Sequence, residues 1–287
     1  MTASEPKSAK TSKAPPNGGS AASADLSFKR AGTGMALVLV HGYLGGSSIW
    51  ADQMVRFGQC RDVICPDLAG FGESAPLESP PSIEAHAQGV LALLDRLGVD
   101  DFELLGHSMG GMIVQEMVKL APHRVRKLVL YGTGPMGVLP GRFETIAQSR
   151  ARLLQDGLAK TASRIAASWF LHREAAAAFG LCEGLGRQAS LQAALASLDA
   201  WEAWNGQAAL ASIKCPTLVL WGSQDRSYGW SQPEALWRGI AGADLAVVPG
   251  AAHIVHLEKP QMFNAILSDF LLTDPAKGSW TGQNEAQ

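Results

Sequence analysis

A serine flanked by glycines is the first residue of this sequence that could attack a carbonyl carbon. Ser108 lies in the run Gly106-His107-Ser108-Met109-Gly110, which matches the pattern G-x-S-x-G. The pattern is typical of a serine on a sharp turn between a strand and a helix, where small neighbours let other backbone approach closely. Such a turn lifts the hydroxyl above the sheet and aims the first N–H of the helix at developing negative charge. We therefore predict that Ser108 is a nucleophile and that the Met109 N–H is an oxyanion donor.

A serine hydroxyl needs a base to be reactive at neutral pH, and the chain offers seven histidines. His253 follows an apolar run at 244–248 and is favoured over His256, which we expect to begin the next helical turn. His107 would point away from the neighbouring hydroxyl, and His41 is expected to shape the loop that follows its strand. The others are expected to be ordinary helix or surface histidines, namely His86, His123 and His172.

The residue that orients the base should be an acid just beyond another strand. Asp225 follows the apolar run at 217–221, whereas the loop at 132–135 holds no carboxylate. Asp225 could instead be a solvated turn aspartate. If it is the acid, the order along the chain is serine, aspartate, histidine.

A second oxyanion donor should come from the loop after the first buried strand. Residues 41–46 (HGYLGG) form a glycine-rich loop at that place. We predict that the Tyr43 N–H is this donor, the alternative being a glycine loop that serves only as a tight turn.

Short apolar strands alternate with amphipathic helices along most of the chain. This order would position the predicted nucleophile, base, acid and oxyanion donors. Strands are expected at 35–40, 62–65, 102–105, 125–131, 217–221 and 244–248. Helices are expected at 48–59, 82–97 (with Ser82 as N-cap), 109–121, 232–240 and 260–272. Strands regularly separated by helices predict an α/β fold with a mostly parallel, doubly wound sheet. We assign this core to residues 25–136 and 212–273.

The alternation stops between 137 and 211, where the sequence is helical in composition. We expect this block to be an inserted helical cap over the carboxyl ends of the strands. A lid of this size encloses a small pocket, which favours a small-molecule substrate. The cap supplies the candidate substrate-binding residues Trp169, Trp201 and Trp204, together with Phe170.

The cap side chains leave two questions open. Trp201 and Trp204 are three residues apart and are expected to share a helix face, which could line the pocket roof or dock the cap onto the core. A cap arginine facing the pocket would suit a carboxylate substrate, although any one of them could be a solvated surface charge. The cap arginines are Arg142, Arg150, Arg152, Arg164, Arg173 and Arg187.

The overall composition excludes some classes of partner. A net charge of −2 gives no general attraction to nucleic acid or to an anionic membrane surface, and no apolar run approaches the length of a membrane span. The start at 1–24 is expected to be a disordered tail and the end at 274–287 a flexible one, with no secretory signal. The four cysteines form no metal-type pair, and we expect a cytoplasmic enzyme without a metal.

At five places the sequence resembles the α/β-hydrolase superfamily, over about residues 34–272. The segments are LVLVHGYLGG, CPDLAGFGES, LLGHSMGG, PTLVLWGSQD and VVPGAAHIVHLEKP. The spacing is similar to that of the lid-bearing group, which includes esterases, enol-lactonases and carbon–carbon bond hydrolases. Epoxide hydrolases and haloalkane dehalogenases are similar overall but use an aspartate where this chain has Ser108. Two departures leave the subfamily open: the HGYLGG loop matches neither the HGGG nor the SGPG type, and Arg226-Ser227-Tyr228 follows the acid.

The resemblance implies a serine hydrolase that cleaves a small carboxylic ester or lactone through an acyl-enzyme. Ser108, His253 and Asp225 would form the triad and would need no metal or organic cofactor. The alternative is hydrolysis of a C–C or C–N bond in a small (di)carboxylic acid from a ring-degradation pathway, by the same residues. A third possibility is a ligand receptor without enzymatic activity. The oligomeric state is not predicted.

Overall fold

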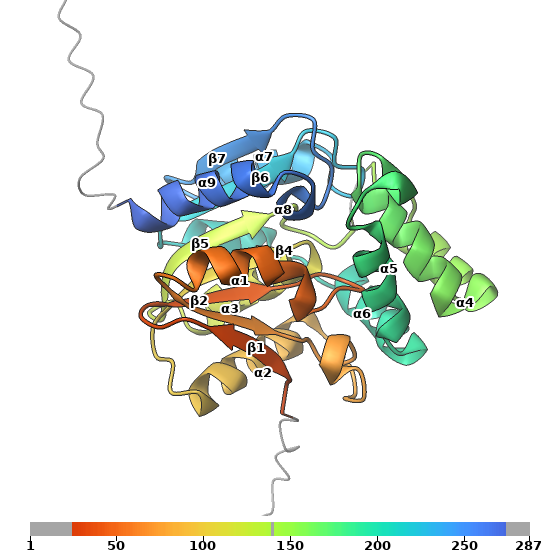
Figure 1. Ribbon diagram of the computed structural model, residues 1–287, viewed down its shortest axis with the longest axis horizontal. Coiled ribbons are helices and arrows are strands. Elements are labelled where there is room, and N and C mark those ends of the chain that lie inside the picture. Colours follow the sequence, from red (N-terminus) through yellow and green to blue (C-terminus); the bar gives the residue numbers. More distant parts are fainter. Residues whose placement is uncertain (1–24, 139–140, 274–287) are drawn as a thin grey trace, which may run out of the picture.

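The computed structural model describes residues 25–138 and 141–273, so the tails expected at 1–24 and 274–287 lie outside the described residues. Within this part of the chain, seven strands form one sheet in the order β1-β3-β2-β4-β5-β6-β7 (Figure 1). The strands are β1 (Phe28–Ala31), β2 (Ala36–Val40), β3 (Asp62–Pro66), β4 (Phe102–His107), β5 (Val125–Tyr131), β6 (Thr217–Gly222) and β7 (Asp244–Val248). β1 runs antiparallel to β3 and the other neighbours pair in parallel, which confirms the mostly parallel α/β sheet.

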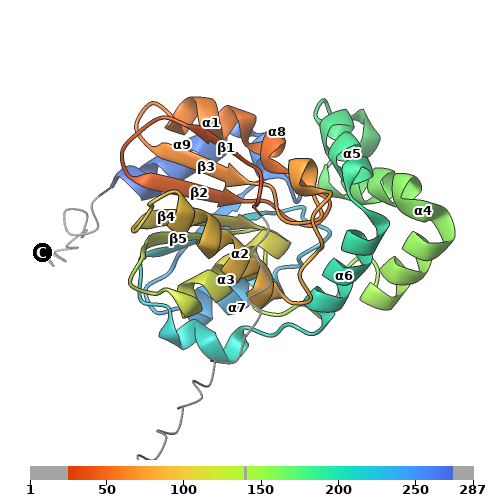
Figure 2. The same ribbon diagram turned by 90° about the horizontal axis from the view of Figure 1, so that it is seen from below.

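Helices cover both faces of the sheet (Figure 2). On one face lie α1 (Ala51–Phe57), α8 (Val255–Glu258) and α9 (Pro260–Leu272); on the other lie α2 (Ile83–Arg96), α3 (Met109–Leu120) and α7 (Ser231–Gly239). Alternate residues of β2 therefore enter different cores: Val38 packs with α2 and α3, and Leu39 with α1 and α9. Because a strand covered on both sides buries every side chain, its sequence reads as a continuous apolar run.

Local signals place the helix ends close to the expected positions. The Ser82 hydroxyl accepts a hydrogen bond from the Ala85 N–H at 3.0 Å, which caps α2 as predicted. The helix expected at 48–59 is divided into a 3-10 turn, Ser47–Trp50, and α1.

The edge strand β1 was not expected from the sequence. Its four residues alternate between exposed and half-buried, so they lack the apolar run that marks the central strands. Arg30 of β1 forms an ion pair with Asp62 of β3 at 2.7 Å. A short, charged edge strand of this kind resists pairing with other chains.

The block between β5 and β6 is helical, as expected. It contains α4 (Ile146–Trp169), α5 (Phe179–Gln188) and α6 (Leu191–Glu202), with 3-10 turns at Arg173–Ala175 and Gln207–Ser212. Figure 1 shows these three α-helices together at one end of the molecule. None of the helices in the described ranges is long and apolar enough to cross a membrane.

The two segments that connect the helical block to the sheet lie side by side. The Gly137 N–H donates to the Trp204 carbonyl at 3.0 Å, and the Gly206 N–H donates to the Pro135 carbonyl at 2.8 Å. A segment whose two ends are paired can be inserted without disturbing the sheet. We propose that residues 137–211 form a cap on a core made of 25–136 and 212–273.

Candidate active site

Ser108 is the one residue between the end of β4 and the start of α3. Its backbone is in the left-handed region, with φ +58° and ψ −121°. A non-glycine residue held in a sparsely populated conformation costs about 1–3 kcal/mol, and such strain gathers at functional sites. The turn is held by hydrogen bonds from the Ser108 N–H to the Tyr131 carbonyl (3.0 Å) and from the Thr133 hydroxyl to the Ser108 carbonyl (2.7 Å).

Gly110 shows why the neighbours of this serine are small. A Cβ at that position would lie 2.4 Å from the Val40 carbonyl oxygen and 2.5 Å from that of His41. The first turn of α3 therefore packs directly against the end of β2. This is the close backbone approach that the G-x-S-x-G pattern predicts.

Asp225 and His253 form a buried pair beyond β6 and β7. The Nδ1 of His253 lies 2.8 Å from Oδ2 of Asp225. The other carboxylate oxygen accepts hydrogen bonds from the N–H groups of Ser227 (2.7 Å) and Tyr228 (3.0 Å), which fix its orientation. Because an ionised carboxylate can only accept, the His253 proton resides on Nδ1 and the lone pair of Nε2 remains available to take a proton.

The backbone of His253 is held on both sides. Its N–H donates to the Trp169 carbonyl at the end of α4 (3.0 Å), and its carbonyl accepts from Nε2 of His107 (3.0 Å). His107 therefore holds the backbone of His253, the proposed base. The Trp169 ring lies 6.3 Å from the His253 imidazole, between centroids.

Two other buried histidines, His256 and His41, have partners of their own. His256 lies in the first turn of α8, stacks on Trp50 at 4.3 Å, and has Nδ1 3.1 Å from the Tyr131 hydroxyl. Burial lowers its pKa to about 3, so it is neutral at ordinary pH. His41 accepts from the Leu68 N–H at Nε2 (3.0 Å) and contacts the Gly42 carbonyl through Nδ1 (2.8 Å), so it shapes the following loop.

The glycine-rich loop at 41–46 lies against Ser108. A Cβ on Gly42 would be 2.8 Å from the Ser108 Cβ, so the backbone of this loop passes directly beside the serine. Tyr43 follows Gly42, and Met109 is the first residue of α3, where N–H groups have no partner within the helix. A small cavity here is lined by Gly42, Tyr43, Gly45, Ile49, His107, Ser108, Trp169 and Ile254.

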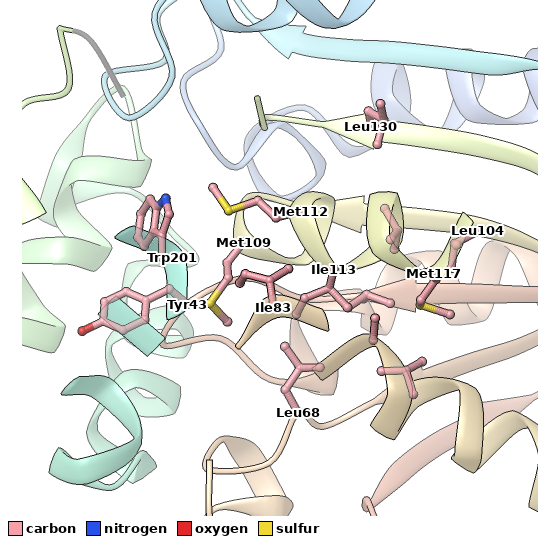
Figure 3. Close-up of a cluster of buried hydrophobic side chains, with 14 of the residues drawn as sticks. Tyr43, Leu68, Ile83, Leu104, Met109, Met112, Ile113, Met117, Leu130 and Trp201 are labelled. Carbon is pink, nitrogen blue, oxygen red and sulfur yellow. The ribbon is translucent and has the colours of Figure 1, made fainter. Parts of the chain in front are cut away.

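The cap tryptophans take different positions, and the expectation that Trp201 and Trp204 share a helix face is wrong. The helix α6 ends at Glu202, because the chain must turn there to pair with its entering segment. Trp204 lies beyond the helix and donates from Nε1 to the Glu116 carboxylate of α3 at 2.9 Å, which docks the cap. Trp201 packs against the Tyr43 ring at 6.1 Å; Figure 3 shows both rings at one end of the core cluster, beside Met109.

Two residues near the His253–Asp225 pair were not identified from the sequence. Tyr228 is fully buried and its ring stacks on the His253 imidazole, at 5.5 Å and 10° between planes. The sequence marked it only as a departure from the resembled pattern. Arg142 lies over the Trp201 ring, with its guanidinium carbon 4.8 Å from the ring centroid, and Trp201 in turn packs on Tyr43. No local signal separates it from the other cap arginines, because its position depends on how the cap docks.

In the described ranges, no group of three or more histidine, cysteine or acidic side chains is arranged to hold a metal ion. The site combines a buried serine with a buried histidine–aspartate pair. The backbone next to Ser108 includes the start of α3 and the glycine-rich loop.

Comparison with known proteins identifies the family. A profile described as alpha/beta hydrolase fold matches residues 36–260. A Pseudomonas savastanoi protein provisionally named carbamate hydrolase RutD is 28% identical over 241 residues, which are 82% of this chain and 93% of that protein. The 2-hydroxy-6-oxononadienedioate/2-hydroxy-6-oxononatrienedioate hydrolase of Paraburkholderia xenovorans is 30% identical over 266 residues, 86% of this chain and 90% of that one.

A solved structure agrees with this assignment. The structure of an N-acyl homoserine lactone degrading enzyme matches with a TM-score of 0.72 and 26% identity, covering 85% of this chain and 96% of the other. The family profile extends over both parts of the core and the block between them. The chain therefore belongs to the alpha/beta hydrolase fold family and is an α/β-hydrolase enzyme.

Proposed function

We propose that this enzyme hydrolyses a small carboxylic ester or lactone through an acyl-enzyme on Ser108. Nε2 of His253 accepts the serine proton as the oxygen attacks the carbonyl carbon, and Asp225 stabilises the imidazolium that forms. The N–H groups of Tyr43 and Met109 donate to the oxyanion. The proton then passes from His253 to the leaving alcohol oxygen. Water next attacks the acyl-enzyme and gives a proton to His253, and this proton returns to the Ser108 oxygen as the acid is released.

The observation that carries this proposal is the 2.8 Å contact between Nδ1 of His253 and Asp225, with both side chains buried. It leaves Nε2 as a base in a protein whose Ser108 has a strained backbone. The match to a lactone-degrading enzyme supports a lactone or ester substrate.

A second candidate is hydrolysis of a C–C or C–N bond in a small (di)carboxylic acid by the same three residues. It is favoured by the 30% identity to a hydrolase of a nonadienedioate, and by the similarity to a protein named as a carbamate hydrolase. Substrate preference separates the two candidates. Fast turnover of small activated esters supports the first, and turnover of a dienedioate with near-silence on esters supports the second.

The test is a panel of short nitrophenyl esters and γ-lactones with the parent enzyme and Ser108→Ala. Removing the nucleophile of such a triad lowers kcat by on the order of 10⁶-fold, so we expect activity to fall to background. Retention of ester turnover in Ser108→Ala would show that this mechanism is wrong.

A further inference from the structure

Arg142 lies in the segment that leads from β5 into the first cap helix, and it is half-buried. Its guanidinium carbon is 4.8 Å from the centroid of the Trp201 ring, a cation–π arrangement. Nη1 donates to the Glu144 carbonyl (2.8 Å) and to the Ser149 hydroxyl (3.0 Å). Both acceptors are neutral groups.

No carboxylate among the described residues lies within ion-pair distance of Arg142. The nearby Glu144 carboxylate is bonded by Arg164, with 2.7 Å to each oxygen, and is also paired with Arg152 at 3.2 Å. The Glu144 carboxylate is therefore already paired with two other arginines. Burial lowers the pKa of Arg142, which reports that its charge is removed from water without a full counter-charge.

Several hydrogen-bond donors in this region have no acceptor. Within the described ranges, Nε of Arg142, the Tyr228 hydroxyl and Nε1 of Trp201 are buried and make no hydrogen bond. A buried polar group without a partner is destabilising, and a charged one is more so. These three groups can all donate and one of them is cationic, so an anion with several acceptor oxygens would satisfy them.

This set of donors adjoins the proposed nucleophile. The Tyr228 ring stacks on the His253 imidazole, at 5.5 Å between centroids, and the Ser108 and Thr133 hydroxyls and the Arg142 charge lower the pKa of its phenol. Burial is the larger effect and raises the pKa of Tyr228, so the phenol stays protonated and can donate. Arg142 lies over the Trp201 ring, and that ring packs on Tyr43 at 6.1 Å between centroids. Tyr43 is the proposed oxyanion residue.

We propose that Arg142 and the Tyr228 hydroxyl bind a carboxylate group carried by the substrate. The natural substrate would then be an ester or lactone with a free carboxylate close to the bond that is cleaved. A guanidinium matches a carboxylate in charge and in planar shape, and the phenol supplies a further donor. This inference rests on the proposed function, because it places the carboxylate relative to Ser108.

The test compares two nitrophenyl esters of similar length, the hemiglutarate with a free carboxylate and the neutral pentanoate. The measured quantity is the ratio of their kcat/KM values. Hydrogen bonds to charged groups contribute about 1.5–3 kcal/mol, so we expect Arg142→Gln to lower the ratio by about 10- to 150-fold. Tyr228→Phe should lower it by a smaller factor. The matched control is Arg152→Gln, an exposed arginine that pairs with the same Glu144 and should keep the parent ratio.

An equal loss for both esters in Arg142→Gln would assign the residue a structural role and overturn the inference. A kcat/KM ratio near one for the two esters in the parent enzyme would also overturn the inference. Turnover of both esters would in that case still support the proposed function. If neither ester is turned over, the proposed function fails, and the carboxylate site is then tested by a binding measurement that does not depend on turnover. Calorimetry would then measure monomethyl glutarate binding to Ser108→Ala, with and without Arg142→Gln. Binding that is lost with the arginine supports the site, and absence of binding to Ser108→Ala overturns it.

Discussion

The backbone N–H of His253 donates a hydrogen bond to the carbonyl oxygen of Trp169, at 3.0 Å. Trp169 is the last residue of α4, so the loop that carries the proposed base is attached to the cap. Arg226, next to Asp225, donates from Nη1 to the neighbouring Phe170 carbonyl at 2.9 Å. The acid and base loops thus share one segment of the cap. Displacement of this segment would disturb both members of the pair.

Glu258 links this cap segment, at 169–171, to the core. Its carboxylate oxygens accept from the Leu171 N–H and the Ala252 N–H, each at 2.6 Å. Glu258→Gln replaces one acceptor with an NH₂ group that faces a donor. We expect the free energy of unfolding to fall by about 1.5–3 kcal/mol and kcat to fall more than KM rises, as measured by urea titration and steady-state kinetics.

The control for this prediction is Glu234→Gln, which removes an acid paired with Arg238 on an exposed helix face. Exposed pairs of this kind contribute about 0.3–0.5 kcal/mol, so this variant should be close to the parent. Parent values of both stability and kcat in Glu258→Gln would contradict the role of Glu258.

Gly42 is required for the close approach of the glycine-rich loop to Ser108. In Gly42→Ala the new Cβ would lie 2.8 Å from the Ser108 Cβ and 3.0 Å from the His107 carbonyl oxygen, so the loop must move. Loss of one oxyanion donor costs about 10²–10³ in kcat, and we expect a decrease of this order with ester substrates. Gly184→Ala is the control, because nothing lies within 4 Å of a Cβ there. A Gly42→Ala enzyme with the parent kcat would show that this loop does not provide a donor.

Trp204 docks the cap through its hydrogen bond to Glu116. Trp204→Phe keeps an aromatic ring but removes the donor, so we expect the free energy of unfolding to fall by about 1.5–3 kcal/mol. The control Trp237→Phe changes a tryptophan that is 37% exposed, against 8% for Trp204, and should change stability little. Equal effects of the two substitutions in chemical denaturation would contradict a docking role.

The buried histidines predict loss of stability in acid. Burial lowers the pKa of His86 to about 4, with a smaller contribution from His41. Below the ordinary histidine pKa of about 6.5, the unfolded chain takes up a proton that the folded protein does not. This group therefore leaves stability unaffected above pH 6.5 and reduces it, by about 1.4 kcal/mol per pH unit, as the pH falls from 6.5 towards 4.

His86→Leu removes one such group. The slope of unfolding free energy against pH, measured by urea titration between pH 4.5 and 6, should decrease by about 1.4 kcal/mol per unit. An unchanged slope would show that His86 does not resist protonation in the folded protein.

Much of this architecture could be predicted from the sequence because the central strands are covered on both faces. Their apolar runs, such as that of β2, stand out within a residue of the observed bounds, and chain order alone puts Ser108, Asp225 and His253 at carboxyl ends of strands. The edge strand β1 was not predicted, because a strand at the edge of a sheet does not need a continuous apolar run. The end of α6 before Trp204 is imposed by pairing with a distant segment, which helical periodicity does not report.

The groups proposed to recognise substrate were beyond prediction for a related reason. Arg142 differs from the other cap arginines only in what surrounds it after folding, namely Trp201 and an acid already taken by Arg164. Tyr228 is placed by backbone hydrogen bonds to Asp225 and from Trp221. Local pattern predicts the residues that we propose to attack a bond. The residues that select the bond depend on how two distant parts of the chain meet.

The most direct test of the central proposal is covalent labelling of the native enzyme with a fluorophosphonate, followed by peptide mass spectrometry. An activated serine is phosphonylated, and we predict a single adduct on the peptide containing Ser108. The adduct should be absent in Ser108→Ala and strongly slowed in His253→Ala, which lacks the base. An enzyme that hydrolyses esters while its adduct forms on another residue, or without labelling of Ser108, would contradict the account.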